Sequence, residues 1–253
     1  MRWLPAGLSI DSLLTLSYYD REQREGRVPR DRAGGEERVT RKWLRERQRD
    51  VYHRRAKEYG FRSRAVFKLL EAAKKYDLMK PGDVVVDLGA FPGGWLQGAR
   101  SLVGDAGFVL GIDLEAIKPL PWPNVKTLVD DLTRVEGGEI LKHLPRRADV
   151  VLSDASPNIS GIWEVDHARQ MDLARHAVEL AGTILRRDGN LMVKAFQGEF
   201  FKGFLDGVKM EYRFVKVFKP RASRKRSAEV YIVALGLGLR GRRYRPSRYA
   251  IRV

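Results

Sequence analysis

Hydrophobic residues along this chain fall into short β-branched runs that alternate with longer amphipathic stretches. Continuous apolar runs such as residues 84–86 are typical of parallel strands buried on both faces. We expect strands at residues 84–88, 107–112, 125–129, 148–153, 190–196, 212–219 and 228–235. We expect helices at residues 40–58, 63–76, 93–102, 136–143, 165–187 and 199–209. This order predicts an α/β protein with a mostly parallel sheet, whose last two strands form an antiparallel edge.

Segments of different composition flank the expected sheet. Residues 1–38 are rich in Gly, Arg and Glu, and we expect them to be poorly ordered. Residues 39–236 form the expected single domain, which opens with a basic helix, and residues 237–253 form a basic tail. No apolar run approaches ~20 residues and no signal peptide is recognisable, so we expect a cytoplasmic protein that does not bind membranes.

One strand is followed by an acid and a glycine-rich loop, Val-Asp-Leu-Gly-Ala-Phe-Pro-Gly-Gly-Trp at residues 86–95. Gly89, Gly93 and Gly94 allow the backbone to approach a ligand closely. A phosphate-binding P-loop would end in Gly-Lys-Ser/Thr, and a dinucleotide loop would read G-x-G-x-x-G. Neither pattern fits, which leaves S-adenosylmethionine (SAM) as the best cofactor. The plain alternative is a strand–turn–helix that binds nothing.

Four of the predicted strands end in acidic residues. Asp87 could meet the amino-acid end of SAM or hold the loop. Asp113 lies about twenty residues beyond the loop, where a carboxylate can accept hydrogen bonds from two ribose hydroxyls. Asp131 could reach the adenine amino group, and Asp154 ends the fourth strand. Each acid alone could be a solvated loop residue or a helix cap. An acid at the end of each of four strands favours a cofactor site.

The formal net charge of +16 is concentrated near the C-terminus. Residues 213–253 hold thirteen Lys or Arg and one acid, Glu229. A second basic region, residues 41–57, carries Trp43 and Tyr52. Basic stretches with aromatic residues suit a phosphate backbone and unstacked bases, so we expect a nucleic-acid partner rather than an Arg-rich solvated surface. The absence of cysteine and the four scattered histidines argue against a disulfide or a catalytic metal.

Four charged residues interrupt apolar segments: Lys68, Asp154, Lys194 and Glu229. A single lysine near a strand end is more commonly an exposed structural residue. Two cations and two anions at the carboxyl edge of one sheet, where open α/β sheets bind ligands, indicate a shared purpose. A charge-balanced cluster of this kind can favour the neutral form of a lysine.

These residues belong to motifs that resemble the FtsJ/RlmE family of SAM-dependent ribose 2′-O-methyltransferases, from about Arg41 to Gly236. The shared motifs are RSRAVFKL at 62–69, VDLGAFPGGW at 86–95, SDASPN at 153–158, VKAFQG at 193–198 and SAEVY at 227–231. The resemblance implies a Rossmann-like SAM methyltransferase fold. That fold has a mostly parallel seven-stranded sheet with an antiparallel edge and helices on both faces.

The resemblance also implies site residues and a substrate. The implied catalytic tetrad is Lys68, Asp154, Lys194 and Glu229. The implied SAM contacts are Gly93, Trp95, Asp113, Asp131 and Asp154. The implied substrate is a uridine ribose of large-subunit (23S) ribosomal RNA within the assembled subunit, and we expect a monomeric enzyme. Phe91 departs from the family pattern, in which a small residue is usual, and its larger side chain would tighten the pocket.

Lys194 is the expected base, because a ribose 2′-hydroxyl is weakly acidic and a neutral amine can accept its proton. Asp154 would orient this lysine and Glu229 would position the hydroxyl. Which lysine carries the proton is a property of the coupled cluster. Two alternatives remain: a 2′-O-methyltransferase acting on transfer RNA or a messenger cap, and a non-catalytic RNA-binding factor in ribosome assembly. A nicotinamide-dependent dehydrogenase would have another glycine pattern and no basic tail.

Overall fold

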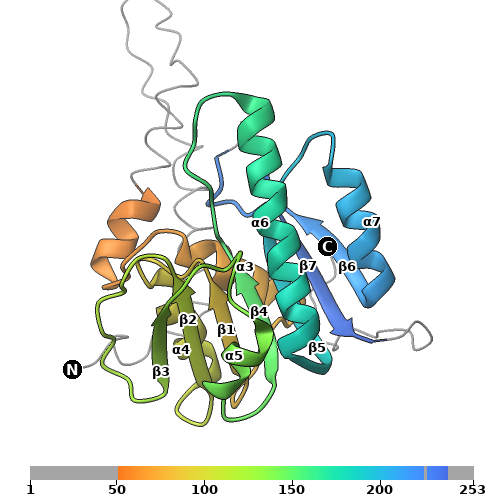
Figure 1. Cartoon of the computed structure of the whole chain (residues 1–253). Helices are drawn as coiled ribbons and strands as arrows, with labels where there is room; N and C mark the ends of the chain where they lie inside the picture. The colour runs from red at the N-terminus through yellow and green to blue at the C-terminus, as the bar shows by residue number, and fades with distance from the viewer. Residues whose placement is uncertain (1–50, 225–226, 239–253) are drawn as a thin grey trace, which may run out of the picture.

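Seven strands form one mixed sheet in the computed structural model of the chain, which describes residues 51–224 and 227–238 (Figure 1). The strands are β1 (Val84–Leu88), β2 (Phe108–Asp113), β3 (Val125–Val129), β4 (Ala148–Ser153), β5 (Leu185–Phe196), β6 (Tyr212–Phe218) and β7 (Glu229–Leu237). They lie in the order β3-β2-β1-β4-β5-β7-β6. Strands β1 to β5 are parallel, and β7 is antiparallel to both β5 and β6. The predicted mostly parallel sheet with an antiparallel edge is therefore confirmed.

Helices cover both faces of the sheet. One face packs against α5 (Gly137–Lys142), α6 (Trp163–Ile184) and α7 (Phe201–Glu211). The other face packs against α3 (Val66–Tyr76) and α4 (Gly94–Val103). Residues 51–58 form a further helical segment before α3. Among the described residues, no helix is long and apolar enough to cross a membrane.

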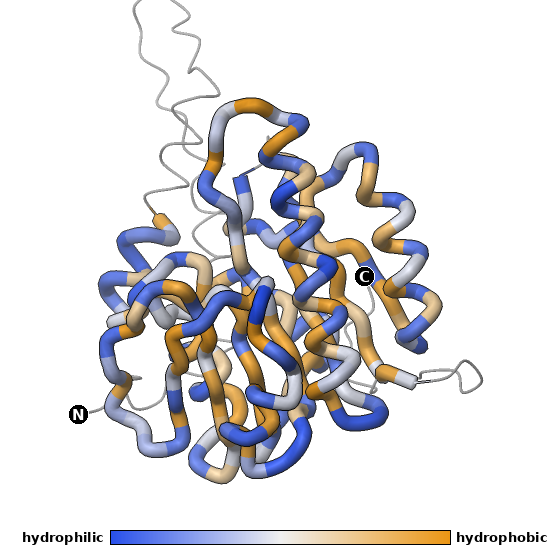
Figure 2. The backbone as a smooth tube through the Cα atoms, viewed as in Figure 1, coloured by the Kyte–Doolittle hydropathy of each residue, from blue (hydrophilic) through white to orange (hydrophobic). Residues whose placement is uncertain are grey.

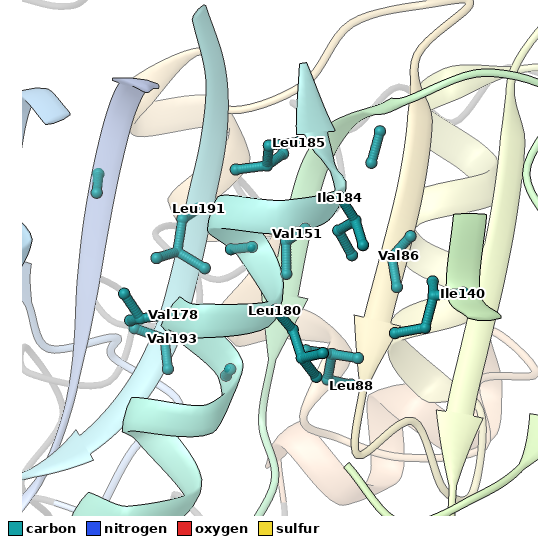
Figure 3. Close-up of a cluster of buried hydrophobic side chains, with 14 of the residues drawn as sticks. Val86, Leu88, Ile140, Val151, Val178, Leu180, Ile184, Leu185, Leu191 and Val193 are labelled. Carbon is teal, nitrogen blue, oxygen red and sulfur yellow. The ribbon is translucent and has the colours of Figure 1, made fainter. Parts of the chain in front are cut away.

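Alternate residues along the central strands build two separate cores. Val86, Val151 and Leu191 point to the α6 face, where they pack around the helix (Figure 3). Val85 and Leu152, each one residue away from a member of the first set, lie in the core under α3 and α4. Each fully buried side chain of this size is worth about 1.5–3 kcal/mol relative to exposure. Burial on both faces explains the continuous apolar runs in the sequence, and Figure 2 shows the strands as the hydrophobic centre.

The junction between α6 and β5 differs from the sequence prediction. The sequence predicts a helix to residue 187, but α6 ends at Ile184 and β5 begins at Leu185. The Arg147 guanidinium donates to two carbonyl oxygens at this end of the helix, at 2.5 and 3.3 Å, which satisfies groups that a longer helix would otherwise pair. Asp188, with φ of 65°, lies where the register of β5 against β4 shifts.

Parts of the sequence prediction lie outside the described residues. They are residues 1–38, residues 40–50 of the basic helix, Trp43 and residues 239–253 of the tail. Residues 225–226 also lie outside them, within the Arg- and Lys-rich stretch 219–226 that joins the last two strands and is called the basic loop below. The domain boundaries at 38 and 236 therefore stay predictions.

Candidate active site

Four separate elements bring the predicted tetrad together at the carboxyl edge of the sheet. Lys68 lies on α3, Asp154 directly follows β4, Lys194 lies near the end of β5, and Glu229 begins β7. Lys68 and Glu229 are 161 residues apart in the sequence, yet their charged atoms touch. The antiparallel direction of β7 is what places its first residue at the same edge as the last residues of β5.

The four charged groups form a continuous chain of contacts. Lys68 Nζ lies 2.8 Å from Glu229 Oε1 and 3.9 Å from Asp154 Oδ1. Lys194 Nζ lies 3.2 Å from Asp154 Oδ1 and donates a hydrogen bond to the main-chain oxygen of Asp154 at 2.7 Å. Asp154 is thus the carboxylate that both lysines share, while Glu229 balances the charge of Lys68.

Tyr231 joins this cluster, although it was not among the residues predicted from the sequence to form the site. Its hydroxyl donates to Asp154 Oδ1 at 2.6 Å and accepts from Lys68 Nζ at 2.8 Å. Its side chain is fully buried, and residue 231 on β7 pairs with Lys194 on β5. Position 231 lies two residues after Glu229 on one strand and therefore shares its face of the sheet, a signal that could have identified it.

Burial and charge together set the protonation of the cluster. Burial alone would raise the pKa of Asp154, but Lys194, Lys68 and the Tyr231 hydrogen bond hold that pKa below its usual range. Burial and the neighbouring carboxylates Asp154 and Glu229 raise the pKa of Tyr231 well above its usual value. Asp154 therefore stays a carboxylate and Tyr231 stays a hydrogen-bond donor over the working range of pH.

Two further side chains tie the cluster to its surroundings. The Gln170 amide on α6 donates to the main-chain oxygens of Ala155 and Lys194, both at 3.2 Å, and so joins the ends of β4 and β5. The Ser223 hydroxyl donates to Glu229 Oε1 at 2.8 Å from the loop that connects β6 and β7. This loop packs against α3 through the buried Ala222, so the basic loop is held close to the cluster.

The glycine-rich loop lies directly beside Asp154. Gly89 has φ of 79°, and a β-carbon there would lie 2.6 Å from the α-carbon of Ala155. Gly93 also has a left-handed backbone, with φ of 103°. Both positions therefore require glycine, one for close approach and the other for backbone conformation. The loop and the tetrad form a single site rather than two neighbouring ones.

The remaining predicted cofactor residues line the β1, β2 and β3 side of this site. Asp113 accepts the backbone N–H groups of Phe91 at 2.8 Å and Glu115 at 2.9 Å, and thereby holds the glycine-rich loop. Asp131 Oδ1 accepts from the N–H and the hydroxyl of Thr133, and these two bonds lower the pKa of Asp131. Asp131 follows β3, the edge strand on the far side of the sheet from β7, and its bonds within the described part of the chain are to residues next to it in the sequence.

Trp95 is held differently from the acids. It is buried, and its indole N–H donates to the main-chain oxygen of Ala65 at 2.7 Å. Its ring centroid lies 5.9 Å from that of Tyr231. Trp95 therefore forms part of the wall between the glycine-rich loop and the tetrad, and its polar atom is already used within the protein.

Asp87 is the least compensated group near the site. The side chain is fully buried, and both carboxylate oxygens have no hydrogen-bond partner among the described residues. Burial, with the nearby charges of Asp154 and Asp113, raises the pKa of Asp87 well above its usual range. A buried polar group without a partner is costly, so this position suits a ligand that brings a donor or a positive charge.

The fold is that of a Rossmann-like α/β protein of the methyltransferase class, with the candidate site at the carboxyl edge of the sheet. The chain belongs to the FtsJ-like methyltransferase family, whose model matches residues 61–237. This match includes all four tetrad positions and the whole glycine-rich loop. It confirms the family resemblance seen in the sequence motifs.

Individual relatives support the same placement. The chain is 45% identical over 201 residues to a protein of Methanocaldococcus jannaschii named ribosomal RNA large subunit methyltransferase E. The aligned region covers 78% of this chain and 82% of the relative. A Methanococcus maripaludis protein of the same name is 48% identical over 209 residues, covering 80% and 78%. A crystal structure from Plasmodium falciparum, described as a ribosomal RNA methyltransferase, superposes with a TM-score of 0.62 at 23% identity. It covers 70% of this chain and 98% of the other and supports the fold alone.

Proposed function

We propose that this protein transfers the methyl group of SAM to a ribose 2′-hydroxyl in RNA. Its proposed target is a uridine of large-subunit ribosomal RNA within the assembled subunit. The observation that carries the reaction is the network in which Asp154 joins Lys194, Lys68 and Tyr231 beside the glycine-rich loop. The names of the relatives support the ribosomal RNA target.

The residues present fit SAM. The unpartnered carboxylate of Asp87 suits the ammonium of the amino-acid end, and the two left-handed glycines leave room for a ligand against the backbone. Asp113 and Asp131 would hold the ribose and the adenine, with Gly93 and Trp95 forming the loop beside them. When bound, SAM supplies an activated methyl group on a sulfonium, so the protein mainly has to orient and deprotonate the acceptor.

Lys194 is the proposed base. Its Nζ is held by two contacts to Asp154, which fix its direction, and its side chain is only 5% exposed. As a neutral amine, Lys194 would accept the proton of the 2′-hydroxyl as the oxygen attacks the methyl carbon. Lys68 places a second positive charge 3.9 Å from the Asp154 carboxylate that it shares with Lys194.

Glu229 and Tyr231 complete the arrangement around the acceptor. Glu229 is fixed by Lys68 at 2.8 Å and by the Ser223 hydroxyl at 2.8 Å, both on Oε1. These two contacts fix the carboxylate and so also the direction of Oε2. Glu229 Oε2 is the proposed acceptor of a hydrogen bond from the ribose 2′-hydroxyl. The Tyr231 hydroxyl bonds to both Asp154 and Lys68 and so fixes the positions of these two side chains.

The basic loop between β6 and β7 is the proposed RNA contact. Lys219, Arg221 and Arg224 are exposed, while Ala222 and Ser223 between them are buried. The loop is anchored on α3 by the bond from Arg221 N to Glu71 Oε2 at 2.9 Å. Buried anchors with exposed cations on either side suit a rigid clamp on the phosphate backbone near the active site.

The direct test is a map of ribose methylation in RNA from a strain that lacks this gene. We expect one 2′-O-methyl group to be missing from large-subunit ribosomal RNA. It should return with the wild-type gene and stay missing with Lys194→Ala. Loss of a methyl group from transfer RNA instead would move the substrate to that class. An unchanged map would leave the non-catalytic assembly factor as the better account.

A further inference from the structure

Four rings gather where α6 begins and β5 ends. Trp163 stacks on Phe196, with ring centroids 6.1 Å apart and an interplanar angle of 14°. His167 packs edge-on against Trp163 and against Phe200, with centroid distances of 5.3 and 5.5 Å. These four residues, Trp163, His167, Phe196 and Phe200, are called the aromatic patch below. They come from two elements and the loop after β5, so the fold assembles them.

The aromatic patch is unusually open to solvent. Trp163 is 45% exposed and Phe200 is 44% exposed. Ile159 and Ile162, in the segment that leads from Asp154 to α6, are more exposed still. Soluble proteins rarely gather large apolar side chains on the surface unless something binds there. None of these residues was predicted from the sequence to have a function.

The position of the aromatic patch relates it to the candidate active site. Phe196 lies two residues after Lys194 on β5 and pairs across the sheet with Glu229. At about 3.3 Å per residue, the α-carbons of Phe196 and Lys194 are separated by roughly 7 Å. Figure 1 shows the connection from β4 to α6 passing over the same edge of the sheet. A nucleotide placed at the tetrad would therefore have its own base or a neighbouring base within reach of these rings.

His167 is the buried member of the aromatic patch, and Trp163 and Phe200 pack against it. The imidazole is buried, and neither ring nitrogen has a hydrogen-bond partner among the described residues. A β-carbon at position 198 would lie 2.2 Å from His167 Nε2, so Gly198 is the residue that allows the chain to pass over the ring. The chain at Gly198 and the rings of Trp163 and Phe200 therefore hold the imidazole in place.

We propose that the aromatic patch stacks an unpaired RNA base within one nucleotide of the methylated ribose. This inference rests on the proposed function, because it takes RNA as the substrate at the tetrad. Proteins hold single-stranded bases on exposed aromatic faces, and Trp163 has the exposure and the rigid backing that such stacking needs. The Arg175 guanidinium lies 5.9 Å from the Phe200 ring centroid and adds a positive charge beside the rings.

The test compares two probes that differ only in their bases: a 12-nucleotide oligouridylate and a ribose–phosphate oligomer of the same length without bases. Trp163→Ala should weaken binding of the oligouridylate by about five-fold or more, the usual effect of losing one stacked base. Binding of the abasic oligomer, and the salt dependence of both, should stay the same because phosphate contacts are kept. Phe200→Ala should act in the same direction.

Two further variants separate stacking from other roles. Trp163→Leu keeps an apolar side chain without a ring, so it should lose as much oligouridylate affinity as Trp163→Ala. Trp122→Ala removes a tryptophan before β3, at the opposite edge of the sheet, and should bind like the wild type. Wild-type affinity in Trp163→Leu would overturn base stacking and favour a protein partner. Equal losses for both probes would overturn it as well, as general damage to the surface.

The proposed function is measured separately in the same samples, by wild-type methylation of large subunits from the deletion strain. Methylation by the wild type, together with unchanged oligouridylate binding in Trp163→Ala, would reject the aromatic patch alone. No methylation by the wild type would reject the proposed function, whatever the binding result.

Discussion

Lys194 contacts Asp154 twice, through the main-chain oxygen at 2.7 Å and through Oδ1 at 3.2 Å. Because an ammonium has three N–H directions, two contacts to one residue leave a single direction of Nζ for an acceptor. That direction carries a lone pair once the amine is neutral. The two contacts therefore leave one direction of Lys194 Nζ open, where the proposed 2′-hydroxyl would bind.

Replacement of Asp87 by Asn should stabilise the protein in the absence of SAM. The pKa of Asp87 is raised in the folded protein, so its folding takes up a proton at any pH between the unfolded and folded pKa values. The loss of folding stability caused by Asp87 is absent below the unfolded pKa. It grows as the pH rises from the unfolded pKa to the folded pKa. Each unit of raised pKa costs about 1.4 kcal/mol at higher pH.

The measurement is the free energy of unfolding in urea from pH 4 to pH 8. Asp87→Asn should gain most over the wild type at the high end of this range and little near pH 4. Glu58→Gln, which removes an exposed carboxylate on the first helical segment, is the matched control and should shift stability little. A loss of stability in Asp87→Asn at pH 7 would mean that this carboxylate is ionised and paired.

Replacement of Asp113 by Ala should weaken SAM binding by roughly 1–3 kcal/mol, the cost of leaving polar ligand groups without a partner. Part of this loss would come from the glycine-rich loop, because Asp113 also accepts the N–H of Phe91. Calorimetry with SAM measures the effect, and Glu115→Ala, two residues away and exposed, serves as the control. Unchanged affinity in a folded Asp113→Ala protein would remove this residue from the cofactor site.

Neutralising Arg221, Arg224 and Arg226 together should weaken RNA binding and reduce its salt dependence. We expect a change of roughly 0.7–0.9 in the log–log salt slope for each lost phosphate contact, with SAM affinity unchanged. The loop should keep its place, because its anchor to Glu71 uses the backbone N–H of Arg221, and the Arg221 side chain in the 3.7 Å ion pair is exposed.

The control for the basic loop is Lys142→Gln at the end of α5, which precedes β4 and so lies at the opposite edge of the sheet. It should leave RNA affinity and its salt slope as they are. If the triple variant keeps the wild-type slope, the loop is a solvated surface rather than an RNA contact.

The fold was predictable because burial on both faces leaves a direct pattern in the sequence. The continuous valines of β1 place that strand at residues 84–88, and the apolar run 190–196 places β5 except for its first five residues. The end of α6 was not predictable, because it depends on Arg147, a residue that precedes β4 and reaches the helix only in the folded chain. Local sequence could show that Asp188-Gly189 interrupts regular structure, but not that the interruption belongs to a strand.

The same limit applies to the candidate site. Charged residues in or next to apolar segments stood out one at a time, and the family motifs grouped them. Tyr231 did not stand out, because a tyrosine in a buried strand is ordinary until Asp154 and Lys68 are seen on its hydroxyl. The aromatic patch was missed for a related reason: Trp163, Phe196 and Phe200 become neighbours only through the crossing of α6 over the end of β5.

The role of Lys194 as the base is tested most directly by single-turnover methylation of large ribosomal subunits from a strain lacking this gene. Lys194→Ala should abolish transfer while SAM and RNA affinities stay near wild type, because the interaction is needed mainly in the transition state. The wild-type rate should rise with pH as the neutral amine becomes available. Lys194→Arg should stay inactive, since a guanidinium keeps its proton at any usable pH. Methylation by Lys194→Arg at a near wild-type rate would contradict the account and leave Lys194 an electrostatic role only.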